Sequence, residues 1–412
     1  MCVFPNRSSF IQHSLAMTVS LLIMTSANAA TNQEEIQKLM EEVKELRALI
    51  QQQYKPTETD QTTVSAPVFN FSPTQPESHI NLYGFLRADA NYIIEGADND
   101  FNAAAKSTAE EAKDKLRTTV KTTRIGLDFS TLNQEAKIGA KVEVDFAGSN
   151  DNLRIRHAYL TYNNWLIGQT TSNFLSSHAP EMMDFSTNIG GGTKQYPQVR
   201  YNYKVTPTNQ FFLAAEKGNN SASNTAIKYR VPVLTAKMMH EFSENKGSTS
   251  LRAMLEQYQA ETLKSDKIGW GIAVGVNYKP IESLKLSADI SHVKGNSHYV
   301  YGSNTAFTVA NGNVEQNEFN AVQIGGTYYI RPNLRTTLAY GAIFADNTNG
   351  YAQSSSSDIS ANEKVQQTWI NFIYSPVAPI DLGLEYINAQ RETFAGEKYR
   401  DNRIGIMAKY TF

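Results

Sequence analysis

From residue 80 onward, polar and apolar side chains alternate with a period of two through most of the chain. The stretch AKIGAKVEVDFA at residues 136–147 places Ile138, Val142 and Phe146 on one phase and Glu143 and Asp145 on the other. Successive side chains of a β-strand point to opposite faces, whereas the side chains of a helix return to the same face about every 3.6 residues. The sequence therefore predicts an all-β fold, and its 21 Tyr, 19 Phe and 24 Gly fit that class.

The same two-faced pattern returns in several further segments. INLYGFLRADANY sets Arg87 and Asp89 against Leu86, and IDLGLEY sets Glu385 against Leu384. One such strand would also suit a soluble β-sandwich whose charged face lies in water. The repetition of the pattern, together with aromatic residues near the ends of the apolar faces, instead favours a membrane barrel with a polar lumen and aromatic girdles.

The N-terminal residues carry the features of a secretory signal. Arg7 precedes the apolar run LAMTVSLLIM, and Ala27 and Ala29 have the small-x-small spacing of a signal peptidase site. We therefore assign residues 1–29 to a signal peptide. A short membrane anchor is the alternative, but the run is shorter than the roughly 20 residues that a spanning helix needs. Cleavage would remove Cys2, the only cysteine, and would leave a mature chain without disulfides.

Two short segments separate the signal from the alternating region. Residues 30–54 contain apolar residues at spacings of three and four, which predicts a short periplasmic coiled coil; a lone amphipathic helix is the alternative. These apolar positions are Ile36, Leu39, Val43, Leu46 and Ile50. Residues 55–79 carry four prolines among Thr, Ser and Gln without periodicity, which is typical of an extended linker. Residues 80–412 would then form the barrel.

The alternating region must cross a membrane as a closed barrel, because only closure pairs every backbone group in lipid. Tight turns alternate with long connections, and we count about sixteen antiparallel strands, with AIKYR assigned to a connection. The long connections lie near residues 97–116, 172–197, 217–232, 295–317 and 346–362. The last strand would pair with the first and place Phe412 in the inner aromatic girdle. A terminal aromatic residue also resembles the signal that the barrel-insertion machinery recognises.

The segment LRIRHAYLTYNNWLIGQTTSNFLSSHAPEMMDF resembles trimeric porins. With the N-terminal coiled coil and the Pro/Thr linker, WLIGQTTSNF and PEMMDF make the chain similar to the DcaP-like porin family over nearly its whole mature length. The resemblance implies a homotrimer in the bacterial outer membrane, through which small anionic solutes, dicarboxylates among them, diffuse. In such porins the loop after the fifth strand folds inward and narrows the channel, and basic residues line the facing wall.

Carried onto this sequence, the inward loop would span residues 172–197 and contain the flexible triplet GGG at residues 190–192. Its candidate site residues are His178, Glu181, Asp184 and Lys194. The candidate pore-lining residues are Arg87, Arg124, Lys141, Arg154, Arg156, Arg200 and Arg403. The alternative for each arginine is an ion pair with a neighbouring carboxylate, such as Asp128 or Glu143, with little effect on the solute.

The alternation becomes ambiguous after Arg156. Continued without a break, it would place Ala158, Leu160 and Tyr162 on the same face as the arginines. A subunit contact or the inward loop would explain an apolar face at this position.

Other functional classes find less support. His157, Ser176, His178 and Asp184 show neither a nucleophile elbow nor the local spacing of a triad, so we expect no enzyme. We find no metal-ligand cluster, phosphate loop or cofactor motif, and a formal net charge of -2 gives no basic footprint for nucleic acid. The alternative to a porin is a structural outer-membrane barrel that is linked to periplasmic partners through its coiled coil.

Overall fold

The computed structural model describes residues 78–412 apart from 109–110, 134, 185–187 and 223. These residues belong to one compact unit, residues 71–412. The predicted signal peptide and coiled coil, and nearly all of the predicted linker, lie outside the described residues. The first strand, β1, begins at Ser78, slightly before the barrel start expected at residue 80.

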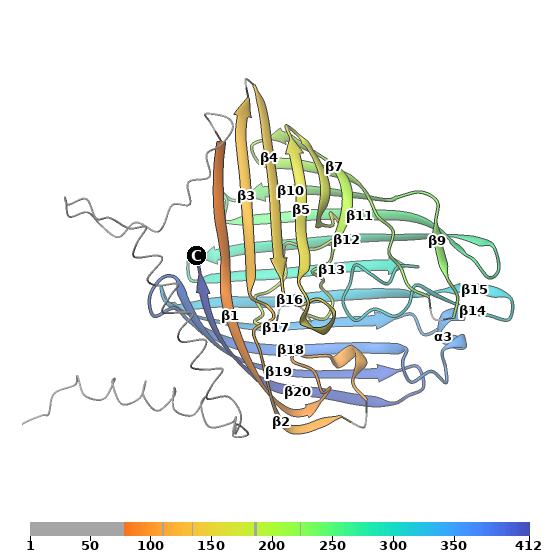
Figure 1. Ribbon diagram of the computed structural model, residues 1–412. Coiled ribbons are helices and arrows are strands. Elements are labelled where there is room, and N and C mark those ends of the chain that lie inside the picture. The colour runs from red at the N-terminus through yellow and green to blue at the C-terminus, as the bar shows by residue number, and fades with distance from the viewer. Residues whose placement is uncertain (1–77, 109–110, 134, 185–187, 223) are drawn as a thin grey trace, which may run out of the picture. The chain divides into compact units, whose positions relative to one another are not determined.

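A single antiparallel sheet closed on itself forms the barrel wall (Figure 1). Its strands are β1 (Ser78–Gly96), β2 (Ala112–Thr119), β3 (Arg124–Asn133), β4 (Ala136–Asp145), β5 (Arg154–Tyr162), β6 (Trp165–Thr171), β7 (Gln195–Thr206), β8 (Asn209–Glu216), β10 (Val233–Phe242), β11 (Gly247–Ala260), β12 (Ser265–Ile281), β13 (Leu284–Lys294), β16 (Glu318–Arg331), β17 (Leu334–Ala345), β18 (Asn362–Tyr374), β19 (Ile380–Thr393) and β20 (Lys398–Thr411). β2 and β3 pair with successive parts of β1 and together count as one strand of the wall, whereas the short β9 (Ile227–Tyr229) pairs only with the end of β11. The wall therefore has sixteen strands, as predicted, and AIKYR lies in a connection.

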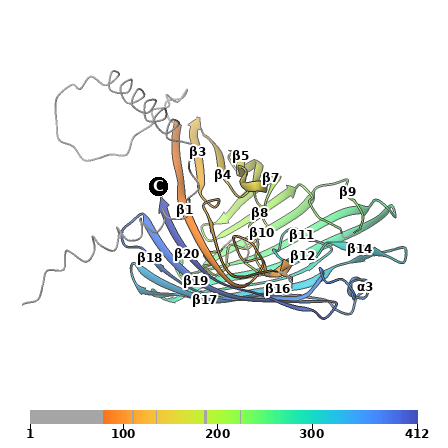
Figure 2. The same ribbon diagram turned by 60° about the horizontal axis from the view of Figure 1, so that its bottom comes forward.

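The barrel closes where β20 pairs with β1. The register runs from Thr411 opposite Phe85 to Asn402 opposite Glu95. Beyond β20, the backbone N–H and C=O of Phe412 each bond to Gly84 at 3.0 Å. Figures 1 and 2 show the orange β1 beside the blue β20. The pairing of the last strand with the first, which the sequence predicted, is confirmed.

The long connections all lie at one end of the wall, which we call the loop end, together with the short connections 261–264 and 394–397. The opposite end, which we call the turn end, has short connections between the described strands. At the turn end, consecutive strands follow each other closely, as β5 and β6 do through Asn163 and Asn164. The loop end carries β9, the hairpin of β14 (Phe307–Ala310) and β15 (Asn313–Gln316), and the helix α3 (Gly350–Ser354). These elements gather on the right of Figure 1, away from the C-terminus. The predicted alternation of turns and long connections is therefore confirmed.

Apolar side chains cover the outside of the wall, and polar ones fill the inside. Leu86 on β1 and Ile406 on β20 are 54% and 58% exposed, whereas Arg87 and Asp89 are 6% and 5% exposed. This distribution reverses that of a water-soluble protein and matches a barrel that is surrounded by lipid. Among the described residues, no helix is long and apolar enough to cross a membrane.

A β-bulge in β5 resolves the ambiguous alternation after Arg156. Glu143 of β4 pairs with His157 and the next residue, Val144, pairs with Ile155, so Arg156 is an extra residue without a partner of its own. A bulge shifts the strand phase by one residue. The expectation that the residues after Arg156 share its face was wrong, since Leu160 and its neighbours in phase point outward. Leu160 and Tyr162 are about half exposed, at 50% and 52%.

Candidate functional site

The connection between β6 and β7, residues 172–194, turns into the lumen, and we call it the inward loop. Its start is bound to Glu216 of β8, a fully buried carboxylate that accepts hydrogen bonds from Ser172 Oγ at 3.0 Å and from the Asn173 backbone N at 3.1 Å. Tyr299, from the long connection after β13, donates its OH to the other Glu216 oxygen at 3.0 Å. A buried carboxylate requires such donors, so this end of the loop is tied to the wall.

The middle of the inward loop is bound to the wall formed by β18 and β19. Glu385, 1% exposed, accepts hydrogen bonds from the backbone N of Met183 at 2.8 Å and of Asp184 at 2.9 Å. Trp369 donates from Nε1 to the Glu181 carbonyl at 2.9 Å. The loop after the fifth wall strand therefore crosses the lumen, in agreement with the geometry that the resemblance implied.

A cavity of ≈ 280 Å³ lies between the inward loop and wall strands that include β1, β3 and β5, and we call it the passage. The charged residues that line it are Arg87, Arg124, Arg156, Arg335, Lys409 and Glu181. The lining thus contains five cationic side chains and one carboxylate, which Arg335 holds through two hydrogen bonds of 2.8 Å. Arg87 is paired with Asp89 at 2.6 Å, and Lys409 with Asp381 at 2.7 Å. The rest of the lining is apolar and includes Met182, Met183 and Met407. Such a passage concentrates positive potential, because its walls have a low dielectric constant.

Two buried carboxylates of β4 form ion pairs with Arg124, Arg154 and Arg156. Glu143 Oε1 lies 2.8 Å from Arg156 Nε and 3.4 Å from Arg124 Nε. Asp145 Oδ2 lies 2.6 Å from Arg154 Nη2 and 3.3 Å from Arg156 Nη1. The ion-pair alternative therefore holds at Glu143, yet Arg124 and Arg156 also line the passage. Three guanidinium groups and two carboxylates leave a net charge of +1 in this cluster, and charge-assisted bonds orient the guanidinium planes.

Four predicted pore-lining residues lie outside this passage: Arg154, which lines a second cavity at the loop end, and three others. Arg403 is fully buried and bonds to Asp401 and to the carbonyl O of Asn99 and of Ala97. Lys141 is bound to Asp128 at 3.2 Å and lies 4.6 Å from the Tyr83 ring. Arg200 lies 5.8 Å from the Phe212 ring, and its Nη1 is 3.5 Å from Asn173 Oδ1. The structure gives these three side chains local contacts with the wall or the loops.

The predicted residues of the inward loop have separate environments. His178 is fully buried, with Nδ1 at 3.2 Å from Ser250 Oγ. Asp184 accepts a hydrogen bond from the backbone N of Asn102 at 2.6 Å, which joins the inward loop to the connection between β1 and β2. Glu181 lines the passage, whereas Lys194 lines a second cavity at the loop end, together with Arg154.

Comparison with known proteins identifies this barrel. A model of the DcaP outer membrane protein family matches residues 23–412. The chain belongs to the DcaP outer membrane protein family. It is similar to the outer membrane channel DcaP of Acinetobacter baumannii, for which there is a crystal structure. The two sequences are 59% identical, the match covers 82% of this chain and 99% of that chain, and the TM-score is 0.79.

More distant structures share the fold alone. The anion-selective porin from Comamonas acidovorans is 13% identical, with 82% of this chain and 100% of that chain covered and a TM-score of 0.55. OmpT of Vibrio cholerae is 14% identical, with 81% of this chain and 98% of that chain covered and a TM-score of 0.54. A comparison with curated proteins finds no match. As a member of the DcaP family, the barrel is an outer membrane channel. Bacterial barrels generally have long loops on the outside and short turns in the periplasm.

Two cationic residues of the DcaP-family passage, Arg335 and Lys409, were missed by the sequence analysis. Arg335 shares its strand phase with the buried Thr337 and Ala339, so the alternation of β17 already pointed it inward. Lys409 shares a face with Arg403 on β20, but only Arg403 was selected. The sequence did not show that the connection between β1 and β2 covers Arg403, whereas Lys409 lines the passage and pairs with Asp381 at 2.7 Å.

The four residues considered for a catalytic triad bind mainly to other residues, although the His178 backbone N donates to Ser176 Oγ at 2.9 Å. Ser176 Oγ donates to Asp289 Oδ2 at 2.5 Å, and the His157 ring bonds to Thr170 Oγ1 at 2.9 Å. The His178 ring lies near Ser250, and the Asp184 carboxylate accepts from Asn102, as described above. Within residues 78–412, less the short gaps, no group of His, Cys, Asp and Glu is placed to hold a metal ion.

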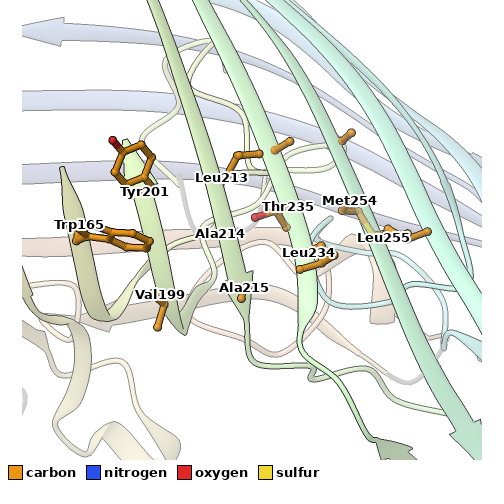
Figure 3. Close-up of a pocket in the computed structure, with 12 residues that line it drawn as sticks. Trp165, Val199, Tyr201, Leu213, Ala214, Ala215, Leu234, Thr235, Met254 and Leu255 are labelled. Carbon is orange, nitrogen blue, oxygen red and sulfur yellow. The ribbon is translucent and has the colours of Figure 1, made fainter. Parts of the chain in front are cut away.

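The outer wall of the DcaP-family barrel carries an apolar groove of ≈ 720 Å³ (Figure 3). Its rim includes Trp165, Leu213, Leu234 and Leu255, which are 48% to 60% exposed and therefore on the lipid side. Figure 3 shows Trp165 and Tyr201 together at one side of the groove. Because its lining is apolar and faces outward, this groove is not part of the solute path.

Proposed function

We propose that the channel passes small hydrophilic solutes with a preference for anions, dicarboxylates among them, and that it works as a homotrimer. The observation that carries the proposal is the passage beneath the inward loop, where five cationic side chains line the cavity with one carboxylate. Lumen-facing charge governs which ions a porin admits, since solutes meet these side chains at close range. The arginines and Lys409 would act by stabilising the solute anion during transit.

The size of the effect follows from Coulomb's law. A carboxylate that passes at ~4 Å from one guanidinium gains about 4 kcal/mol at an effective dielectric constant of 20, and about 1 kcal/mol in bulk water. A dicarboxylate engages two cations at once. Since the Debye length is about 8 Å at physiological ionic strength, the preference should decrease as the salt concentration rises.

Planar-bilayer recording of the full chain tests the proposal. Under a KCl gradient the reversal potential should indicate chloride preference, and succinate should permeate faster than a neutral solute of similar size. Conductance that appears in groups of three equal steps would support the trimer. A cation-selective or non-conducting barrel would contradict the proposed function, and a non-conducting barrel would favour the structural alternative.

We extend the proposal to the N-terminal residues and to assembly in the membrane. Residues 1–29 would direct export, and residues 30–54 would form a periplasmic coiled coil below the trimer. Phe412 would contribute to recognition by the barrel-insertion machinery. Its ring is 40% exposed on the outer face and lies 6.5 Å from the Tyr410 ring, as expected for an aromatic girdle.

Replacing Phe412 by aspartate should lower the amount of barrel in the outer membrane more than the same change at Thr411. Phe412 points to the lipid interface, where a carboxylate replaces an aromatic girdle residue, whereas Thr411 lies on the opposite phase. The measurement is the membrane yield of heat-resistant barrel for both variants at equal expression. Equal yields would show that the ring of Phe412 is dispensable.

A further inference from the structure

A second cavity, of ≈ 690 Å³, lies at the loop end of the channel, and we call it the vestibule. It is formed by the connection between β1 and β2, the end of the inward loop, and the long connections after β13 and β17. Its volume falls within the range of small-molecule sites, about 300–1,000 Å³. None of the residues that line the vestibule lines the passage beneath the inward loop.

Three cationic side chains from different parts of the chain meet in the vestibule. Lys106 comes from the short helix η1 (Ala104–Lys106), Arg154 from the start of β5, and Lys194 from the end of the inward loop. Asp358 is the acidic residue in the lining. Lys194 is exposed to water there, yet partial desolvation and the positive charges of Arg154 and Lys106 lower its pKa. Arg154 and Lys106 therefore both act on Lys194.

The two lysines differ from Arg154 in their ion-pair partners. Arg154 is paired with Asp145 at 2.6 Å. Within the described part of the chain, neither Lys106 nor Lys194 lies within ion-pair distance of a carboxylate, although both line the same cavity. Their charges are available to an incoming solute.

Close backbone contacts fix the segment that leads to Lys194. Gly190 has a φ of +80°, and a Cβ at Gly192 would lie 2.1 Å from the Tyr299 carbonyl O. The Tyr301 backbone N donates to the Gly191 carbonyl at 2.7 Å. The glycine triplet allows this close approach, which places the segment against the connection after β13. A lysine that follows a fixed segment loses less freedom when it binds a solute.

We propose that the vestibule is an anion-capture site for small carboxylates, in which Lys106, Lys194 and Arg154 bind the solute before it enters the passage. The inference rests on the proposed function and adds an entry site with its own residues. Asp145 contacts both Arg154 and Arg156, so the two arginines of β5 join the vestibule to the passage. On this route a carboxylate leaving Lys194 meets Arg154, which lines the vestibule, and then Arg156, which lines the passage.

The test measures how often succinate interrupts the current through single channels of the full chain when it is added to either chamber. The double variant Lys106→Gln and Lys194→Gln should reduce the event rate from the chamber that faces the vestibule roughly tenfold at low salt, since electrostatic attraction speeds encounter by about that factor or more. The rate from the other chamber should stay unchanged. The asymmetry between the two chambers should therefore fall.

A matched control is the double variant Lys228→Gln and Lys264→Gln. Both lysines are exposed at the loop end, and neither lines the vestibule or the passage, so the change in net charge is the same. The control should keep the wild-type asymmetry. Equal falls in both variants would show a general charge effect and overturn the proposal, as would an unchanged rate in the vestibule variant.

The outcomes separate this proposal from the proposed function. An anion-selective wild-type channel whose vestibule variant keeps its event rate would overturn the capture site alone. A wild-type channel without anion preference in its reversal potential would overturn the proposed function. Heat-resistant mobility of each variant on gels establishes that the barrel is folded before the recordings are compared.

Discussion

Replacing Arg156 by glutamine should move the reversal potential toward cations and slow the passage of succinate. The cluster of three guanidinium groups and two carboxylates loses its net positive charge when Arg156 becomes neutral. The fold should tolerate the change, because Glu143 keeps Arg124 at 3.4 Å and the Tyr83 OH at 2.9 Å. The interaction energy of one ion contact is about 1 kcal/mol even in bulk water, and its loss corresponds to a change of roughly fivefold in relative permeability.

The variant Glu143→Gln should have the opposite effect. It removes a carboxylate behind the same arginines and leaves the cluster with a larger positive charge, so anion preference should increase. Both shifts should shrink as salt is raised, because the passage contains water and ions screen the charges. A neutral solute of similar size should pass both variants at the wild-type rate.

Arg400→Gln is the control for the loss of one positive charge. Its side chain is 66% exposed, and its nearest carboxylate, Glu95, is 3.9 Å away. It should leave the reversal potential unchanged. If Arg156→Gln behaves like this control, or if Glu143→Gln shifts the potential in the same direction as Arg156→Gln, the passage is not where ions are selected.

The wall of the barrel could be predicted from the sequence because apolar residues that face lipid alternate with polar residues that face the lumen along each strand. Leu86 and Ile406 had to face lipid, and Arg87 had to face the lumen, so the alternation determined both the strand and its orientation. The length of the connections then distinguished the two ends. The inward path of residues 172–194 came from a family resemblance, since the loop has no periodic pattern that would show where it binds.

The environment of individual lumen residues could not be predicted, because it depends on contacts between distant segments. Arg403 and Lys409 share a strand face, yet the carbonyl groups of Ala97 and Asn99 cover only Arg403. The bulge at Arg156 depends on the register with β4 and leaves little signal within β5 itself. The vestibule similarly combines Lys106 and Lys194 from connections that are far apart in sequence.

Replacing Glu385 by alanine should increase the single-channel conductance and the current noise. Glu385 holds the middle of the inward loop through the backbone N–H groups of Met183 and Asp184, and it also accepts a hydrogen bond from Asn371 Nδ2 at 3.0 Å. Hydrogen bonds to a charged group contribute about 1.5–3 kcal/mol each. Without them the loop should leave the wall for part of the time, and the passage beneath it should widen.

The conservative variant Glu385→Gln and the neighbouring variant Glu392→Ala make this prediction specific to the loop. Glutamine keeps one acceptor oxygen and should give an intermediate conductance. Glu392 lies on the same strand, but its side chain is 36% exposed and bound to Lys398 at 3.3 Å, so its removal should leave the conductance unchanged. Because β19 keeps its backbone pairing with β18 and β20 in all three variants, the barrels should remain heat-resistant on gels. Wild-type conductance and noise in a folded Glu385→Ala barrel would mean that the loop is held in the lumen by its remaining contacts, those of Glu216, Trp369 and Arg335, and that Glu385 is not required.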